Sequence, residues 1–335
     1  MTTSLKSLAL VAALGCALAG NAMAATTLKW ATAAPEKSVW GAQISKFAAA
    51  VENHSGGELK LEVFWGSALG TDADNIRQLQ RGRLDAGSFT AAVLPTVEPA
   101  TAVLAMPYAW SGMKELSCVL EGPTKAELAT LLDAQGMHLV GWSLVGEMGF
   151  SSLEPVKSIA DLAGASIRSI PSKASTDFWS AAGLVPQTIP PSDIAPALST
   201  KRISAAEGSM VFYVVTGENK VAPHWTQAKH IYIPATFLVS KKVYNGLSDK
   251  QKMALEKAME EVSLPWFTAA LNGFMERVKQ MQAGAGGTYS ELSAEDTKTL
   301  RAHALATRPA ALEALGDGAK ALWAKIETAK GACAQ

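Results

Sequence analysis

The stretch Asp161–Trp179, DLAGASIRSIPSKASTDFW, places one arginine, Arg168, in an otherwise apolar, strand-like run that Pro171 ends. A guanidinium stays ionised and offers a planar set of donors, which a carboxylate can accept two at a time. An arginine at the end of a buried strand therefore has two interpretations. It forms a structural ion pair with an internal acid, or it binds an anionic small molecule, and the residues alone favour the ion pair.

Patterns that would indicate catalysis or metal binding are missing from the sequence. The five histidines show no His-Glu-x-x-His spacing and no pairing with cysteines at metal-ligand distance. The run Gly141–Gly146 has one residue too many for a nucleophile elbow. Carboxylate pairs such as Asp72 and Asp74 lie in helical patterns, where solvation is the default. We therefore assign no catalytic residue, no metal and no cofactor, and keep an exported hydrolase only as a remote alternative.

Composition predicts a large core and no attraction to polyanions. The chain has 335 residues, of which 48% are apolar, and equal numbers of basic and acidic residues give a net charge of zero. At roughly 150 residues per domain, this length predicts two domains. A neutral chain does not attract nucleic acid or an anionic membrane surface by charge.

The first 24 residues have the pattern of a secretory signal. They carry Lys6, an apolar run from Leu8 to Leu18, and small residues at Ala22 and Ala24 that fit a cleavage site. The apolar run is shorter than the ~20 residues that a membrane anchor needs. We expect cleavage near Ala24 and a soluble mature chain in the periplasm.

Two cysteines, Cys118 and Cys333, remain after this cleavage. In an oxidising compartment they can form a disulfide that holds the C-terminal tail, or they can be two unrelated thiols. The sequence does not show whether their Cα atoms come within the ~7 Å that a bridge requires, so both alternatives stay open.

The hydrophobic periodicity predicts alternating strands and helices. A strand over 28–32 precedes a helical pattern that contains Trp40, and further strands are expected over 84–89 and 138–142. The alternation restarts after Asp161, and the pattern from Ser248 onward is helical, with Pro265 as an expected kink. The fold class is therefore α/β, with mostly parallel sheets covered on both faces.

Several segments, in their order along the chain, carry a family resemblance. They are LKWATAAPEKSVW, VENHSGGELKLEVF, GSALG, LQRGRLDAGSF, MPYAW, DLAGASIRSIPS and SKKVYNGLSDKQK. Together they resemble the solute-binding proteins of tripartite ATP-independent periplasmic (TRAP) transporters, of the DctP-like type. The resemblance covers essentially the whole mature chain.

The resemblance implies a two-lobed periplasmic binding protein of the type II-like class, which closes around its ligand and hydrolyses nothing. We expect lobe I over 25–146, lobe II with Arg168 over 147–234, and a return to lobe I over 235–335, where long C-terminal helices span both lobes. The implied partners are a small-molecule carboxylate and the small and large permease subunits, which an ion gradient drives. A secreted receptor of the same fold, signalling to a sensor protein, is the alternative.

The resemblance also implies the ligand contacts. Arg168 falls on the family's arginine that pairs with the ligand's carboxylate, so here the binding interpretation replaces the structural one. Where the family often has a second arginine or a glutamine, this sequence has Met148, next to Glu147, and Ser209 stands at a ligand-contacting asparagine position. These departures favour a monocarboxylate with an apolar or aromatic body. The other predicted contacts are Thr90, Phe89, Phe212 and Trp40.

Overall fold

A computed structural model describes residues 25–284 and 286–333, and the predicted signal segment lies outside these residues. Its strands form one mixed sheet in the order β2-β1-β3-β9-β4-β7-β5-β6, with β8 on β4 and β10 on β8. The strands are β1 (Thr26–Thr32), β2 (Leu59–Phe64), β3 (Ala86–Thr90), β4 (Met137–Ser152), β5 (Ser166–Ser169), β6 (Val185–Thr188), β7 (Ala205–Ser209), β8 (His224–Gln227), β9 (Tyr232–Ser240) and β10 (Thr288–Glu291).

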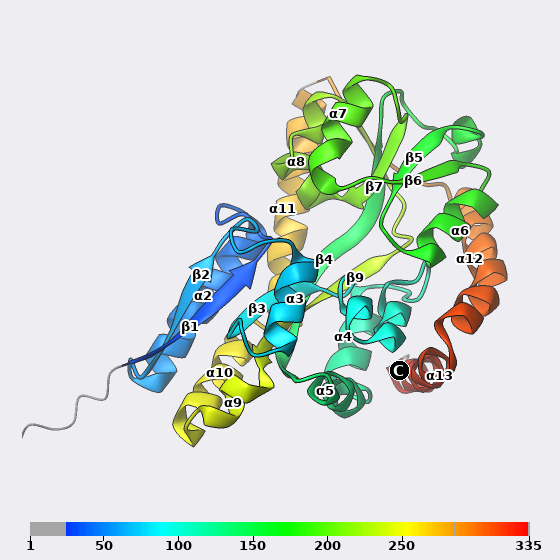
Figure 1. The fold of residues 1–335 in the computed structure, drawn as a ribbon. Coiled ribbons are helices and arrows are strands. Elements are labelled where there is room, and N and C mark those ends of the chain that lie inside the picture. The colour runs from blue at the N-terminus through cyan, green and yellow to red at the C-terminus, as the bar shows by residue number, and fades with distance from the viewer. Residues whose placement is uncertain (1–24, 285, 334–335) are drawn as a thin grey trace, which may run out of the picture.

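Helices cover this sheet, in agreement with the predicted α/β class (Figure 1). They are α2 (Val39–Ser55), α3 (Asp72–Gln80), α4 (Met113–Glu121), α5 (Lys125–Ala134), α6 (Lys173–Ala181), α7 (Ile194–Ser199), α8 (Met210–Val215), α9 (Lys241–Gly246), α10 (Asp249–Glu261), α11 (Leu264–Gly284), α12 (Ala294–Leu315) and α13 (Asp317–Cys333). Short 3-10 segments are η1 (Leu94–Thr96), η2 (Pro99–Ala105), η3 (Ile159–Leu162), η4 (Pro191–Asp193) and η5 (Glu218–Lys220).

The sheet has two halves that share the long strand β4. The first half-sheet contains β2, β1, β3, β9 and the start of β4, and the second contains the end of β4 with β7, β5, β6, β8 and β10. The pairs made by β4 and β9 are antiparallel, whereas β1, β2 and β3, and likewise β5, β6 and β7, pair in parallel. The expected lobe boundary between residues 146 and 147 thus falls inside β4.

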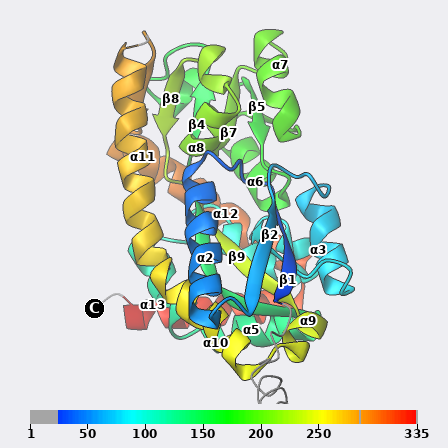
Figure 2. The same cartoon turned by 90° about the vertical axis from the view of Figure 1, so that its left-hand side faces the viewer.

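Long helices bridge the two halves. In Figure 2, α11 runs from the level of α10, beside the first half-sheet, to the level of β8 in the second. It packs on β4, α8 and β10 as well as on α2. No helix in the described residues is long and apolar enough to cross a bilayer.

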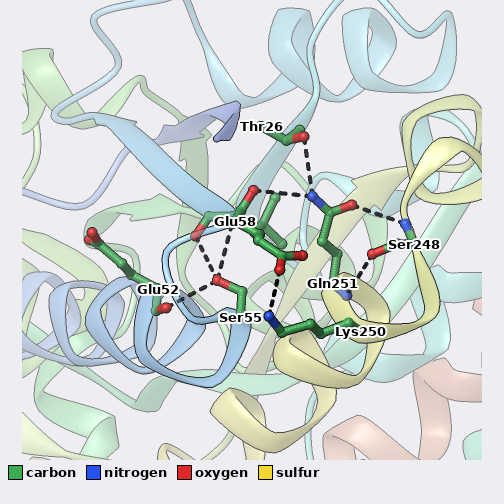
Figure 3. A network of polar contacts seen from close by, with 8 residues as sticks. Thr26, Glu52, Ser55, Glu58, Ser248, Lys250 and Gln251 are labelled. Carbon is green, nitrogen blue, oxygen red and sulfur yellow. Dashed lines mark hydrogen bonds and ion pairs between the residues drawn. The ribbon is translucent and has the colours of Figure 1, made fainter. Parts of the chain in front are cut away.

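The start of α10 shows how the sequence fixes a helix beside the first half-sheet. Ser248 accepts a hydrogen bond from the backbone amide of Gln251, and the Gln251 side chain accepts one from the amide of Ser248, as the capping box predicts. The Gln251 amide nitrogen also donates to Thr26 and to the carbonyl of Glu58, and Lys250 pairs with the Glu58 carboxylate (Figure 3). These contacts join α10 to β1 and to the turn between α2 and β2.

The expected kink at Pro265 is instead a break between two helices. The first of them, α10, ends at Glu261, and α11 begins at Leu264, so Pro265 lies in the first turn of α11. A proline is tolerated there because the first turn of a helix needs no intrahelical N–H donor.

A disulfide between Cys118 and Cys333 holds the C-terminal helix, which decides between the two alternatives that the sequence left open. It joins α4 to the end of α13. Lys330, one turn earlier, lies over the ring of Trp323 on the same helix and over the ring of Trp110, so that α13 also contacts the segment before α4.

Candidate functional site

Arg168 lies on β5 between two parallel neighbours, opposite Gln187 on β6 and Ala206 on β7. Its side chain is buried, with 6% of the residue exposed. Its Nε donates to the carbonyl of Ile189 at 3.1 Å, and its Nη1 donates to the carbonyl of Glu207 at 2.7 Å. Both carbonyls lie beyond the residues paired with Arg168, so the guanidinium leans toward the carboxyl ends of the strands, where α/β sheets bind ligands.

The guanidinium of Arg168 has no direct ionic partner in the described part of the chain. No carboxylate oxygen of a described residue comes within 4.0 Å of it, and its Nη2 has no hydrogen-bond partner among these residues. Burial lowers the pKa of Arg168, while the charges of Glu207 and Glu218 raise it. The structural ion pair that the residues alone favoured is therefore not formed.

Glu207 fixes the backbone around Arg168 through its side chain. Its carboxylate is fully buried and accepts hydrogen bonds from His230 Nε2 at 2.7 Å, from the backbone amide of Ile170 at 2.8 Å and from Ser175 Oγ at 2.9 Å. Burial opposes its ionisation, but the hydrogen bond and charge of His230, then the Ile170 amide and Arg168, lower the pKa of Glu207. The Glu207 carboxylate thus links β7, β5, α6 and the segment before β9.

Sequence reasoning missed Glu207 and His230. A signal for Glu207 was present, because it is the one acid in the run AAEGSM, where an apolar strand is expected. A buried acid in a strand requires donors, and these come from distant segments that the sequence does not bring together.

A first cavity of about 60 Å³ lies in the first half-sheet, beyond the carboxyl ends of β1 and β3. We call it the first cavity; its lining includes Thr32, Ala33, Trp40, Gln43, Asp72, Ser88, Phe89, Thr90, Ser143, Val145 and Phe212. The rings of Trp40 and Phe212 lie 5.1 Å apart and bring α2 against α8. Aromatic and aliphatic groups make most of its wall.

An irregularity in β4 places two of the residues that line the first cavity. The ladder between β4 and β9 shifts register between Leu144 and Gly146, so Val145 is an extra residue that lines the first cavity. Pro234, opposite Leu144, has no N–H to donate, and the Leu144 carbonyl accepts a hydrogen bond from Trp40 Nε1 at 3.0 Å instead. The bulge therefore fixes the indole that faces Phe212.

A second cavity of about 340 Å³ lies where β5 meets α6. It is lined by Ala91, Ala92, Pro95, Thr96, Ala102, Ala105, Ile170, Pro171, Ser172, Lys173, Ala174, Ala311, Ala314 and Leu315. Segments from the first half-sheet, from the end of β5 and from α12 thus enclose it together. Its volume is within the range of small-molecule sites, about 300–1,000 Å³.

The predicted contact residues fall into three groups. Trp40, Phe89, Thr90 and Phe212 line the first cavity together. Met148 and Ser209 face each other across β4 and β7, and Ser209 caps α8, three residues before Phe212 packs on Trp40.

Glu147 belongs to neither of these two cavities. It pairs with Tyr232 on β9, and its pKa is raised by burial, with Lys229 opposing and Glu291 adding to the shift. Because side chains alternate along a strand, Glu147 points to the face opposite that of Met148.

The chain resembles proteins of one family in sequence and structure. A family model described as "Bacterial extracellular solute-binding protein, family 7" (DctP) matches residues 30–308. A solute-binding protein from Verminephrobacter eiseniae is 27% identical over 245 residues, which cover 72% of this chain and 72% of the relative.

Two solved structures share the fold. A TRAP periplasmic solute-binding protein from Roseobacter denitrificans, with bound β-D-glucuronate, has a TM-score of 0.82 at 24% identity, covering 90% of this chain and 99% of its own. Another, from Desulfovibrio salexigens with bound orotic acid, has a TM-score of 0.84 at 19% identity, covering 92% and 99%.

Proposed function

The chain belongs to bacterial extracellular solute-binding protein family 7, the DctP family of TRAP transporters, and we propose that it captures one organic carboxylate between its two half-sheets. The family is one of binding proteins, whose partners are a small-molecule ligand and a membrane permease. In our proposal the ligand is a monocarboxylate with an apolar or aromatic body, and an ion gradient drives the permease that receives it from the periplasm.

The unpaired guanidinium of Arg168 carries this proposal. A buried cation without an anionic partner is unfavourable, because desolvation costs several kcal/mol and an attraction must offset it. Two backbone carbonyls fix Nε and Nη1, which leaves Nη2 without a partner in the described residues. A ligand carboxylate at this position would supply the missing charge and accept a strong, charge-assisted hydrogen bond.

The body of the ligand is proposed from the walls of the two cavities. Trp40, Phe89 and Phe212 give an aromatic lining, and the second cavity is lined mostly by alanine and other small apolar residues. Met148 offers a polarisable apolar surface in place of a second polar clamp. The bound orotic acid of one neighbour is an aromatic carboxylate, and the bound glucuronate of another is a sugar acid, so the fold accommodates both kinds.

The proposed closure follows from the strands that both halves share. The first cavity is lined mainly by the first half-sheet and by Phe212 of α8, while Arg168 belongs to the second half-sheet. We expect the two halves, as lobes I and II, to rotate about β4 and the start of β9. Closure would exclude water and strengthen the pairing of Arg168 with the ligand.

The test is a panel of aliphatic, aromatic and sugar monocarboxylates, screened by thermal shift and then by calorimetry on the wild-type protein. A ligand at a hundred times its Kd stabilises the folded state by about 2.7 kcal/mol. Arg168→Ala is expected to weaken binding by about 3 to 5 kcal/mol, which is a hundredfold or more. Arg168→Lys keeps the charge but loses the planar fork, and should recover only part of the affinity.

The matched control is Arg77→Ala, because Arg77 is exposed and, among the described residues, forms an ion pair only with Asp74 one turn away. It should leave both affinity and stability nearly unchanged. Equal affinities for wild-type protein and a folded Arg168→Lys variant would refute the role of Arg168. An absence of binding across the whole panel would refute carboxylate capture itself.

A further inference from the structure

Most polar side chains in the lining of the first cavity are already bonded to each other. Ser88 donates to Thr32 at 2.8 Å, Ser143 donates to the Gln43 side chain at 2.5 Å, and the Gln43 amide donates to the carbonyl of Val262. Two lining residues differ. No hydrogen bond to the side chain of Asp72 or Thr90 is formed by a described residue, although both face the same cavity.

Asp72 is the more unusual of the two. Its Oδ1 is buried and has no hydrogen-bond partner among the described residues. Burial raises the pKa of Asp72 from 3.8 to about 6, and no neighbouring charge contributes to this shift. An unpaired carboxylate in an apolar lining is costly, so a natural site that contains one is a candidate for a ligand contact.

The helix that begins at Asp72 does not use this carboxylate. Thr71 caps α3 by accepting a hydrogen bond from the amide of Asp74, and the Thr71 hydroxyl donates to Asp74 Oδ2 at 2.6 Å. Asp74 also accepts from Arg77 at 3.2 Å, and its pKa is lowered by these contacts. Of two acids in one helical turn, therefore, Asp74 stabilises the start of α3, while Asp72 lines the cavity and has no hydrogen-bond partner in the described part of the chain.

The chemistry of Asp72 determines what it can recognise. With a pKa of about 6, the carboxyl is mostly ionised at neutral pH, and the positive end of the α3 dipole favours the same form. An ionised carboxylate only accepts hydrogen bonds. We propose that Asp72 is a specificity-determining ligand contact and that the ligand carries a hydrogen-bond donor, a hydroxyl or an ammonium group, at the end remote from its carboxylate.

This inference rests on the proposed capture of a carboxylate and narrows its ligand class. The proposed ligand has an anionic end for Arg168, an apolar middle against Trp40 and Phe212, and one donor for Asp72. The first cavity, about 60 Å³, is too small for a whole ligand, whose sites span about 300 Å³ or more, so it takes the end of the ligand that carries the donor. The Thr90 hydroxyl, which no described residue hydrogen-bonds, is a second acceptor or donor in the same lining.

The test compares matched carboxylates that differ only at the far end. One series is 4-hydroxybenzoate, 4-methoxybenzoate and benzoate, and the other is 6-hydroxyhexanoate, 6-aminohexanoate and hexanoate. Each is measured by calorimetry on the wild-type protein and on Asp72→Asn, Asp72→Ala and Asp74→Asn. The last variant is the control, since it changes an exposed acid of the same helical turn.

We expect a donor-bearing ligand to bind at least about tenfold more tightly than its donor-free match in the wild-type protein. Asp72→Ala should reduce this preference to less than about threefold, Asp72→Asn should reduce it in part, and Asp74→Asn should preserve it. A larger loss for 6-aminohexanoate than for 6-hydroxyhexanoate would identify an ammonium group as the donor, and the reverse a hydroxyl.

Failure of this inference differs from failure of the proposed function. If carboxylates bind and Arg168→Lys weakens them, but the preference for a donor is absent or survives Asp72→Ala, the role of Asp72 is refuted and carboxylate capture stands. If no carboxylate of either series or of the wider panel binds, both are refuted. Thermal unfolding of each variant without ligand shows that the comparison is made between folded proteins.

Discussion

The two half-sheets that would form the walls of the proposed cleft differ in how their acidic side chains are hydrogen-bonded. In the second half-sheet, Glu207 is surrounded by donors from His230, Ile170 and Ser175. On the side of the first half-sheet, Asp72 has a buried oxygen to which no described residue donates a hydrogen bond. Accordingly, the pKa of Glu207 is lowered, while that of Asp72 is raised to about 6. One acid is part of the framework, and the other is available to a ligand.

This difference suggests a division of work between the walls. A carboxylate that accepts several hydrogen bonds is held in one geometry, which suits a function common to all carboxylate ligands, the orientation of Arg168. An unsatisfied acceptor in an apolar lining discriminates between ligands, because it is stabilised only by those that bring a donor. The second half-sheet would then recognise the class of ligand, and the first would select the individual member.

The largest expected effect is a loss of stability on replacement of Glu207, in the second half-sheet. Glu207→Ala removes the shared acceptor of three donors and leaves the buried charge of Arg168 with weaker compensation. We expect a loss of about 3 to 5 kcal/mol in the free energy of unfolding, measured by urea denaturation at pH 7. Glu207→Gln, which keeps the shape and one acceptor, should lose less. If Glu207→Ala were as stable as the wild-type protein, the network would not be a framework.

The pH dependence of this effect has a definite sign. Because the folded state lowers the pKa of Glu207 below its ordinary value of 4.5, its contribution is present above that pH and is lost as the pH falls. The stability difference between the wild-type protein and Glu207→Gln should therefore be largest near neutral pH and shrink below about pH 4.5. A difference independent of pH would mean that the carboxylate acts through its shape and not its charge.

The next effect concerns Asp72, on the side of the first half-sheet, whose ionisation destabilises the folded state instead of stabilising it. The folded state raises the pKa of Asp72 from 3.8 to about 6, so the folded chain is penalised as the pH rises through this window. Without ligand, Asp72→Asn should be more stable than the wild-type protein by about 1 to 2 kcal/mol at pH 7.5. The gain should disappear near pH 3.8, where the wild-type carboxyl in the unfolded chain also becomes protonated.

Asp74→Asn provides the contrast for this measurement. Its carboxylate is exposed and bonded to Thr71 and Arg77, and its pKa is lowered. That variant should be slightly less stable than the wild-type protein at pH 7.5, not more. A loss of stability for Asp72→Asn at neutral pH would show that Asp72 is part of the framework after all, and the contrast between the walls would fail.

How far the sequence predicted this arrangement differs between the walls. Arg168 stood out because a lone charge in an apolar strand is visible in one dimension, and the alternation of strands and helices gave the α/β class. Trp40, Phe89, Thr90 and Phe212 do line one cavity, as predicted contacts should, but their contact with a ligand stays a prediction. The resemblance supplied these positions; periodicity alone would have assigned the aromatic residues to the core.

One physical reason explains why the sequence predicted neither Asp72 nor Glu207 as a site residue. Whether an acid is solvated, paired or left unpaired depends on groups that distant segments bring to it. Glu207 receives its donors from Ile170 after β5, from α6 and from the segment before β9, and Asp72 shares its cavity with residues of α2 and β3. In the sequence, Asp72 and Asp74 look alike, two acids in the first turn of a helix. Only the packing of α3 determines that Asp74 bonds to the cap residue Thr71 while Asp72 lines the cavity.

The smallest expected effect examines whether the first wall is also positioned by polar contacts. Trp40 is held by one hydrogen bond, from its Nε1 to the carbonyl of Leu144 at the β4 bulge. Trp40→Phe keeps an aromatic ring against Phe212 but leaves that carbonyl without its donor. We expect a loss of about 1 kcal/mol in the free energy of unfolding. Affinity for an aromatic carboxylate should fall by less than about fivefold, since ring packing is largely retained.

The affinities of Trp40→Phe for donor-bearing and donor-free carboxylates show whether Trp40 and Asp72 act independently. If the first wall selects ligands mainly by shape and by Asp72, Trp40→Phe should weaken donor-bearing and donor-free carboxylates to the same extent. A selective loss of the donor-bearing ligands would mean that the indole also orients Asp72 across the cavity that both residues line. Selectivity would then be a property of the whole wall, fixed through the bulge at Val145, and not of one carboxylate.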